Sequence, residues 1–355
     1  MNSTITAMHY CLPTKRLTND ELVERFGAQQ LRSIIKMVGI NERRVVQSGV
    51  TAADLAYQAA RGLITDRKID PASIDLLIFA SQTGDYQIPA TACVMHQRLG
   101  LAENCAAFDI NLGCSSFPYS MSVAHGMIVA GIARRALVLN ADAITMVIHP
   151  MDRGLVPLHG DAAVATLVEP CSDGDGFMGF ELGTDGSGYA HLLIPASGAR
   201  MSRSADTKKE IKDESGIIRT QEHLYMNGPA VFHFSLHKVP AVIKAMLDRF
   251  HFTVADLDLV ILHQANRTMV DMIYRALEVP AEKRFYFSEM VGNASGASSP
   301  MVLAEAWRQG RVRLGSYILL AAFGNGLSWG ITIIHWPDNM GPAVMSAVDY
   351  QEQKP

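Results

Sequence analysis

The chain has 355 residues, of which 48% are hydrophobic and 19% charged, and its formal net charge is −4. This composition is typical of a globular protein with a large core, and it excludes a disordered chain. A slightly acidic chain without a Lys/Arg tract is not expected to bind nucleic acid.

The N-terminal sequence, MNSTITAMHYCLPTKRL, lacks the basic start and unbroken apolar segment of a secretory signal. No apolar run approaches the ~18 residues of a membrane span. The five cysteines form no C-x-x-C pair, and their odd number argues against a closed disulfide framework. We therefore expect a cytoplasmic protein that has no membrane partner and binds no metal.

The first half of the chain alternates helical and strand patterns, which predicts an α/β fold with helices on the faces of a sheet. In chain order the predicted elements are a polar helix around NDELVERF (19–26), a helix over 51–66, a strand over 74–81, a helix around 90–100, a β-prone run over 106–113, a helix from Ser115 onward and a strand over 136–142.

The second half repeats this order. Asp75 in SIDLLIFASQ matches Asp258 in DLDLVILHQA, 183 residues later. Similar offsets separate two further pairs of segments. Cys114 matches Asn293, each being followed by a helix, and the strand ALVLNAD matches the strand YILLAAF. Three segments with offsets between 179 and 183 residues, near half the chain, indicate a duplication, that is, two βαβαβ halves around a pseudo-twofold axis. The turns bearing Cys114 and Asn293 should then face each other.

A polar segment, 195–223, has no counterpart in the first half and is expected to be an inserted surface loop, although loops of this length are often lids. After it, VFHFSLHKVPAVIKAMLDRF has apolar residues at helical spacing around Pro240, where we expect a kink.

Cys114 lies at a predicted strand-to-helix elbow, in FDINLGCSSFPYS. The positive end of the helix dipole favours thiolate there and can lower the pKa of a cysteine, so the residue is a candidate nucleophile. The alternative is a structural role, because free cysteines are often buried as small hydrophobic residues.

Three further elements are candidates for the same site. His263 follows the apolar strand LDLVIL, Asn293 lies in the small-residue turn VGNASGASSP, and Phe323 starts the turn FGNG. Taken singly, the histidine could be structural, the asparagine a helix cap and the glycine-rich segment a plain turn.

Six segments in this order give the chain its resemblance to a known family: FDINLGCSSFPYS, DRGLVPLHGDAA, MNGPAVF, HQAN, GNASGASSP and FGNGLSWG. Together they resemble the thiolase-like condensing enzymes, and most closely β-ketoacyl-acyl-carrier-protein synthase III, from about residue 39 to residue 330. The resemblance implies a thiolase-like α/β fold with α-β-α-β-α layers. It also implies two halves, 1–172 with the nucleophilic cysteine and 173–355 with the histidine and asparagine.

The resemblance assigns roles residue by residue. Cys114 would carry the acyl group, and His263 and Asn293 would hydrogen-bond the thioester carbonyl of a malonyl-type extender. The backbone N–H groups of Cys114 and Asn325 would form the oxyanion hole, with Phe323 shielding the site from water. The reaction that the resemblance implies is a decarboxylative condensation in fatty-acid, polyketide or other secondary-metabolite synthesis, which would need no cofactor.

The resemblance also implies binding residues and partners. Arg153 would contact the nucleotide of coenzyme A and Asn266 its pantetheine arm, Met226 would line the acyl tunnel, and Ile88 would reach into the acyl pocket of the second subunit of a homodimer. The implied substrates are acyl-coenzyme A or an acyl-carrier-protein thioester, and a malonyl thioester.

Four positions depart from the family pattern: Ser33, Met37 and Pro229 replace an aromatic, an arginine and an asparagine, and HGDAA (159–163) replaces F-G-D-G-A. Loss of the aromatic and the arginine weakens the adenine site, which favours delivery by a carrier protein. Two alternatives stay open: acyl transfer to an oxygen or nitrogen nucleophile without decarboxylation, and a catalytically silent subunit of a heterodimer.

Overall fold

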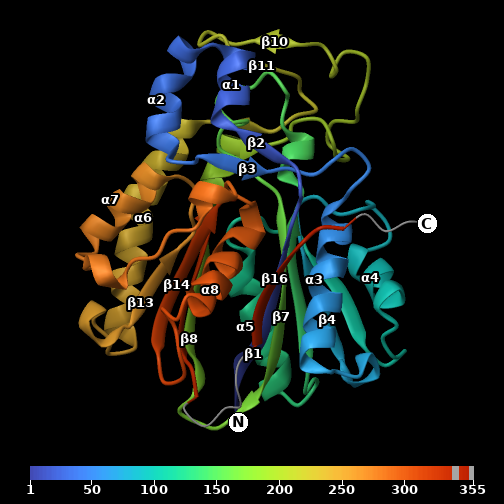
Figure 1. Ribbon diagram of the computed structural model, residues 1–355, viewed down its shortest axis with the longest axis vertical. Coiled ribbons are helices and arrows are strands. Elements are labelled where there is room, and N and C mark those ends of the chain that lie inside the picture. The colour runs from blue at the N-terminus through green and yellow to red at the C-terminus, as the bar shows by residue number, and fades with distance from the viewer. Residues whose placement is uncertain (338–343, 352–355) are drawn as a thin grey trace.

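The computed structural model describes residues 1–337 and 344–351, which form two β-sheets with helices outside and between them (Figure 1). The first sheet has the strand order β16-β1-β7-β6-β4-β5. Its strands are β1 (Asn2–Leu12), β4 (Leu76–Ala80), β5 (Ala106–Ile110), β6 (Ala136–Asp142), β7 (Ala162–Cys171) and β16 (Val344–Asp349). The second sheet has the order β13-β14-β15-β8, with β8 (Gly176–Thr184), β13 (Leu259–Leu262), β14 (Tyr317–Gly324) and β15 (Ser328–His335).

Helices cover the sheets in the five-layer order that the resemblance implies. The outer face of the first sheet packs against α3 (Ala52–Arg67) and α4 (Thr91–Leu99), and that of the second sheet against α6 (Gly228–Arg249) and α7 (Arg267–Ala276). Between the sheets lie α5 (Ser116–Val129) and α8 (Ser298–Arg308), whose apolar side chains join both inner faces in one core.

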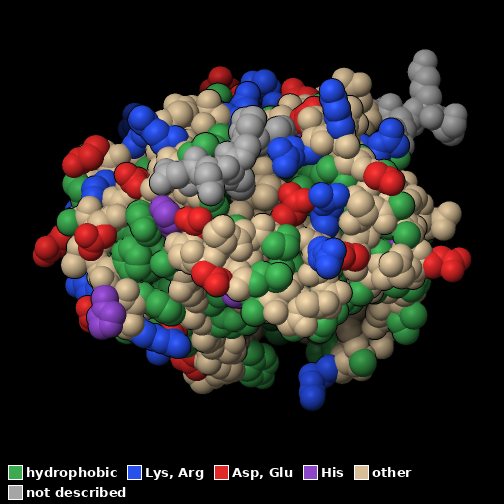
Figure 2. Space-filling view, turned by 90° about the horizontal axis from the view of Figure 1, so that it is seen from below, with side chains coloured by type: hydrophobic (Ala, Val, Ile, Leu, Met, Phe, Trp, Pro, Cys, Tyr) green, Lys and Arg blue, Asp and Glu red, His purple; other side chains and the backbone are tan. Residues whose placement is uncertain are grey.

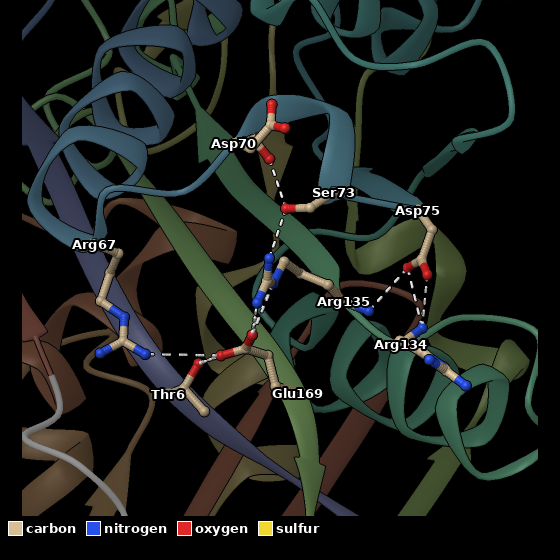
Figure 3. A network of polar contacts seen from close by, with 8 residues as sticks. All are labelled: Thr6, Arg67, Asp70, Ser73, Asp75, Arg134, Arg135 and Glu169. Carbon is tan, nitrogen blue, oxygen red and sulfur yellow. Dashed lines mark hydrogen bonds and ion pairs between the residues drawn. The ribbon is translucent and has the colours of Figure 1, made fainter.

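The two halves share a specific hydrogen-bond pattern at the predicted repeat. The carboxylate of Asp75 accepts from the backbone N–H of Arg134 and of Arg135 (Figure 3), and that of Asp258 accepts from the N–H of Tyr317 at 2.8 Å. Each aspartate therefore ties the start of one parallel strand to the start of its neighbour, β4 to β6 and β13 to β14.

The chain leaves the first sheet at Cys171 and enters the second at Gly176, so the expected boundary at 172/173 falls in the connecting turn. The expected halves differ from the sheets at one place. The strand β16 lies in the 173–355 half, but it pairs in parallel with β1 of the first sheet.

Two short helices, α1 (Asn19–Phe26) and α2 (Ala28–Val38), lie at one end of the molecule together with most of segment 195–223 (Figure 1). That segment is mainly exposed and contains a small hairpin, β10 (Ile211–Lys212) and β11 (Ile218–Arg219). Its flanks pair with each other through β9 (Leu192–Leu193) and β12 (Tyr225–Met226), and β2 (Arg16–Thr18) pairs with β3 (Glu42–Arg44).

The helix α6 continues from Gly228 to Arg249 with Pro240 inside it. On the face that Figure 2 shows, basic and acidic side chains of the described residues are interspersed. No helix among the described residues is long and apolar enough to cross a membrane.

Candidate active site

Cys114 sits at the elbow that the sequence predicts, between the end of β5 at Ile110 and the start of α5 at Ser116. Cys114 is 9% exposed to solvent, and its Sγ lies 3.9 Å from Oγ of Ser295 in the second half of the chain. A hydrogen bond of 2.7 Å between the hydroxyls of Ser115 and Ser328 fixes the elbow against β15. The two predicted turns therefore face each other.

The expected lowering of the Cys114 pKa is wrong for the free protein. Burial raises the pKa of its thiol to about 12, and the nearby carboxylate of Asp142 acts in the same direction. The hydrogen bond to Ser295 opposes this shift without cancelling it. The thiol of the free protein is therefore neutral at physiological pH.

His263 follows the last residue of β13, and its N–H donates to the carbonyl of Ala321 in β14 at 2.8 Å. Its Nδ1 is buried without a hydrogen-bond partner, so Nε2 is the nitrogen that can act in the cavity. Burial, followed by the charge of a protonated His159, lowers the pKa of His263 to about 3. The imidazole is therefore neutral at physiological pH.

The backbone of Asn293 is held on both sides by the segment 158–160. Its N–H donates to the carbonyl of Leu158 at 3.0 Å, and its carbonyl accepts from the N–H of Gly160 at 3.1 Å and contacts Nδ1 of His159 at 3.2 Å. Gly160 is required here, because a Cβ would lie 2.0 Å from the carbonyl oxygen of Val291.

The side chain of Asn293 is oriented by its own turn. Its Oδ1 accepts from the N–H of Ser295 at 3.0 Å, which leaves the Nδ2 group free to donate into the cavity. The alternative for this residue is a helix cap. In the described part of the chain, no side chain caps the start of α8, so Asn293 does not cap that helix.

The end of β14, at Phe323 and Gly324, and the turn after it form the next part of the site. The ring of Phe323 stands at 88° to the imidazole of His263, with 5.7 Å between the centroids. A Cβ on Gly324 would lie 2.6 Å from Cβ of Cys114 and 3.0 Å from its Sγ. Only glycine therefore leaves room for the thiol at this position, and Asn325 follows at the cavity wall.

These residues line one cavity of about 630 Å³. Of the expected binding residues, Met226 and Asn266 line it, and so do Met37 and Pro229; Oδ1 of Asn266 also caps α7. Arg153 and Ile88 lie outside this wall. The guanidinium of Arg153 donates to Oε1 of Gln30 at 2.8 Å and to the carbonyl of Ser215, and Ile88 is 87% exposed on its loop.

Sequence reasoning did not single out Asp142 as a site residue, although it ends the predicted strand ALVLNAD. Its carboxylate is fully buried and accepts from the N–H groups of Gln82 (2.8 Å) and Gly296 (3.1 Å). It thus ties β6 to loops from both halves next to Cys114. Burial raises its pKa against these hydrogen bonds. An acidic residue at the carboxyl end of a buried strand was the available signal.

The described residues contain no group of three or more His, Cys, Asp or Glu side chains arranged to hold a metal ion. The buried thiol, neutral imidazole and carboxamide donor, placed at one cavity of a five-layered fold, define an acyltransferase of the thiolase-like condensing class.

Comparisons with known proteins agree. Two family descriptions match, "3-Oxoacyl-[acyl-carrier-protein (ACP)] synthase III" over residues 108–186 and its C-terminal counterpart over 247–336. A β-ketoacyl-[acyl-carrier-protein] synthase III of Desulfitobacterium hafniense is 34% identical over 92% of this chain and 95% of its own. The chain therefore belongs to the β-ketoacyl-acyl-carrier-protein synthase III family.

Solved structures give the same result. A 2.1 Å crystal structure of a 3-oxoacyl-(acyl-carrier-protein) synthase III is 36% identical, with a TM-score of 0.92, over 95% of this chain and 100% of that one. The priming β-ketosynthase from the R1128 polyketide pathway is 29% identical, with a TM-score of 0.83, over 95% of this chain and 97% of that one.

Proposed function

We propose that the protein condenses an acyl group, carried on Cys114, with a malonyl thioester and releases carbon dioxide and a β-ketoacyl thioester. The observation that carries this proposal is that Cys114, His263 and Asn293, which come from three distant segments, line a single cavity. The reaction so written uses only these side chains and backbone N–H groups and needs no cofactor.

In the first half-reaction the sulfur of Cys114 attacks the carbonyl carbon of the acyl donor. A new carbon–sulfur bond forms, the bond to the donor sulfur breaks, and the thiol proton ends on the departing sulfur. The backbone N–H groups of Cys114 and Asn325 hold the oxyanion. The close packing of Gly324 against Cys114 supports this role, because it brings the segment that bears Asn325 near the nucleophile.

In the second half-reaction the malonyl thioester occupies the cavity with its carbonyl oxygen between His263 and Asn293. Both groups donate hydrogen bonds, and the neutral state of His263 is compatible with donation from Nε2. Loss of carbon dioxide leaves an enolate that these donors stabilise. Its carbon attacks the acyl carbonyl, the carbon–sulfur bond to Cys114 breaks, and the leaving thiolate takes up one proton from water, since the pKa of this thiol is raised.

The proposed substrates are an acyl donor on coenzyme A or on acyl carrier protein, and malonyl-acyl carrier protein. Arg153 is already hydrogen-bonded to Gln30 and Ser215, and Ser33 offers no aromatic surface, which favours the carrier protein over the coenzyme A nucleotide. Resemblance to the R1128 priming enzyme supports polyketide as well as fatty-acid priming.

We further propose a cytoplasmic homodimer. β5 is an edge strand with partly exposed residues, which suits pairing with a second copy. The exposed Ile88, on the loop between β4 and α4, would reach the partner's cavity.

The test is mass spectrometry of the intact protein after exposure to acyl thioesters, followed by addition of malonyl-acyl carrier protein. We expect an acyl adduct that maps to Cys114, is absent in Cys114→Ala, and is consumed to give a β-keto product. An adduct that transfers only to alcohols or amines would instead establish the non-decarboxylating reaction. A protein that takes up no acyl group would be a silent subunit.

A further inference from the structure

Resting on the proposed function, we infer that the acyl group loaded on Cys114 is uncharged and of medium length, and not acetyl. Its length is about eight to twelve carbons, if each heavy atom of the chain fills roughly 30 Å³ of the cavity. The wall and the size of the cavity both favour such a chain.

One part of the cavity wall is entirely apolar. We call it the apolar chamber and define it by six side chains that line the cavity and pack in one cluster: Ile144, Val147, Leu192, Ile194, Leu224 and Met226. They come from the turn after β6, from β9 and the residues after it, and from β12 and the residue before it. Because a hydrocarbon chain has no group for a polar wall to bind, such a surface selects for alkyl substrates.

The chamber walls are fixed to one another by backbone hydrogen bonds. The N–H of Leu224 donates to the carbonyl of Val147 at 2.8 Å, and Met226 pairs with Leu192 in the β9–β12 ladder. The chamber is therefore a built part of the fold and does not depend on the exposed hairpin of segment 195–223.

The size of the cavity separates short from medium chains. At roughly 30 Å³ per heavy atom, an acetyl group occupies about 90 Å³, and a decanoyl group about 330 Å³. The cavity holds about 630 Å³. A decanoyl chain thus leaves about as much space again for the thioester arm of the donor, whereas acetyl would leave the chamber empty.

The charge of the wall excludes a second class of donor. Among the described residues, no Lys, Arg, Asp or Glu lines the cavity. A dicarboxylic acyl group would therefore bring a carboxylate into the chamber without a partner, at a large desolvation cost.

The experiment measures single-turnover acylation of Cys114 by intact-mass spectrometry, using N-acetylcysteamine thioesters of even-numbered acyl chains from acetyl to dodecanoyl and of succinate. We expect decanoyl to react at least about tenfold faster than acetyl, since each methylene removed from water favours binding about fourfold at most. The succinyl thioester should acylate Cys114 more slowly than the uncharged thioester of the same length, butyryl.

Filling the chamber should shorten the preferred chain. We expect Ile144→Phe and Val147→Phe each to move the optimum by about two carbons, because a phenyl ring takes the space of several methylene groups. Met146→Phe is the matched control, since Met146 lies on the same turn, is 54% exposed and does not line the cavity. The optimum should not move in this control.

The outcomes separate the inference from the function on which it rests. Fastest acylation by acetyl, or an unchanged chain-length profile in both filled variants, overturns the medium-chain inference while the condensing function stands. Failure of every thioester to acylate Cys114 overturns the proposed function itself.

Discussion

The thiol sulfur of Cys114 lies 3.9 Å from the hydroxyl oxygen of Ser295, and this contact joins the two turns that the duplicated halves contribute to the site. Ser295 adopts a left-handed backbone conformation, with φ at 49°, between Asn293 and Gly296. Its own N–H orients the Asn293 carboxamide, so one residue touches the nucleophile and positions the amide donor.

Replacing Ser295 should slow acylation. In Ser295→Ala the hydroxyl can no longer stabilise the thiolate, and we expect a loss of about 10- to 100-fold, since a hydrogen bond to a charged group contributes about 1.5–3 kcal/mol. The measurement is the single-turnover acylation rate as a function of pH. Ser298→Ala is the control, because Ser298 is buried nearby and its hydroxyl has no partner among the described residues. Equal rates in the two variants would contradict the role of Ser295.

A methyl group at position 324 should block the thiol. The Cβ in Gly324→Ala would overlap both Cβ and Sγ of Cys114, and displacing the nucleophile by about 1 Å should lower the acylation rate about 100-fold. Gly186→Ala is the control, since nothing lies within 4 Å of its Cβ position. Comparing the circular dichroism and melting curves of both variants separates a blocked site from a misfolded one. An active Gly324→Ala protein would show that Sγ reacts from another position.

The two half-reactions should separate in Asn293→Asp. The variant keeps the oxygen that accepts from Ser295, but it places a carboxylate beside the developing enolate, which repels it. We expect release of carbon dioxide from the malonyl thioester to fall by about 100-fold or more, as for loss of a single oxyanion donor. Acylation of Cys114 should persist. A variant that condenses at the wild-type rate would remove Asn293 from the mechanism.

The buried histidines should make the fold sensitive to acid. Burial lowers the pKa of His159 to about 4 and that of His263 to about 3, from an ordinary 6.5. The folded-state pKa values lie below the unfolded ones, so their stabilising effect is complete above pH 6.5 and is lost as the pH falls toward 4 and 3. When the pH is lowered from 7 to 5, each histidine should reduce the free energy of unfolding by about 2 kcal/mol.

His159→Phe isolates one of these contributions. It removes one titrating ring while the N–H of Gly160 still donates to the Asn293 carbonyl. Urea denaturation at pH 7 and pH 5 should show a loss in unfolding free energy that is smaller in the variant than in the wild type by about 2 kcal/mol. Identical losses would mean that His159 is already protonated, or exposed, in the folded protein.

The parts of the site that rest on local patterns were predictable from the sequence. The strand ALVLNAD coincides with β6, and an apolar run followed by a polar turn placed both Cys114 and His263 at the ends of strands. The repeat was visible because Asp75 and Asp258 make the same kind of hydrogen bond in both halves.

The parts that depend on distant packing were not predictable. The helix end beside Cys114 suggested a lowered thiol pKa, but burial by residues from elsewhere in the chain raises it. The contact between His159 and the carbonyl of Asn293 spans 134 positions, and the β9–β12 ladder has only two residues in each strand. Neither leaves a periodic pattern in the sequence.

The pairing of β16 with β1 places the last described strand of the chain against the first, and Asp349 there binds the guanidinium of Arg44 at 2.7 Å. During synthesis on the ribosome, β1 lacks this neighbour until residues 344–349 have been made. The outer edge of β1 therefore stays open until that point, and a nascent chain stalled before residue 344 would expose this edge to other chains.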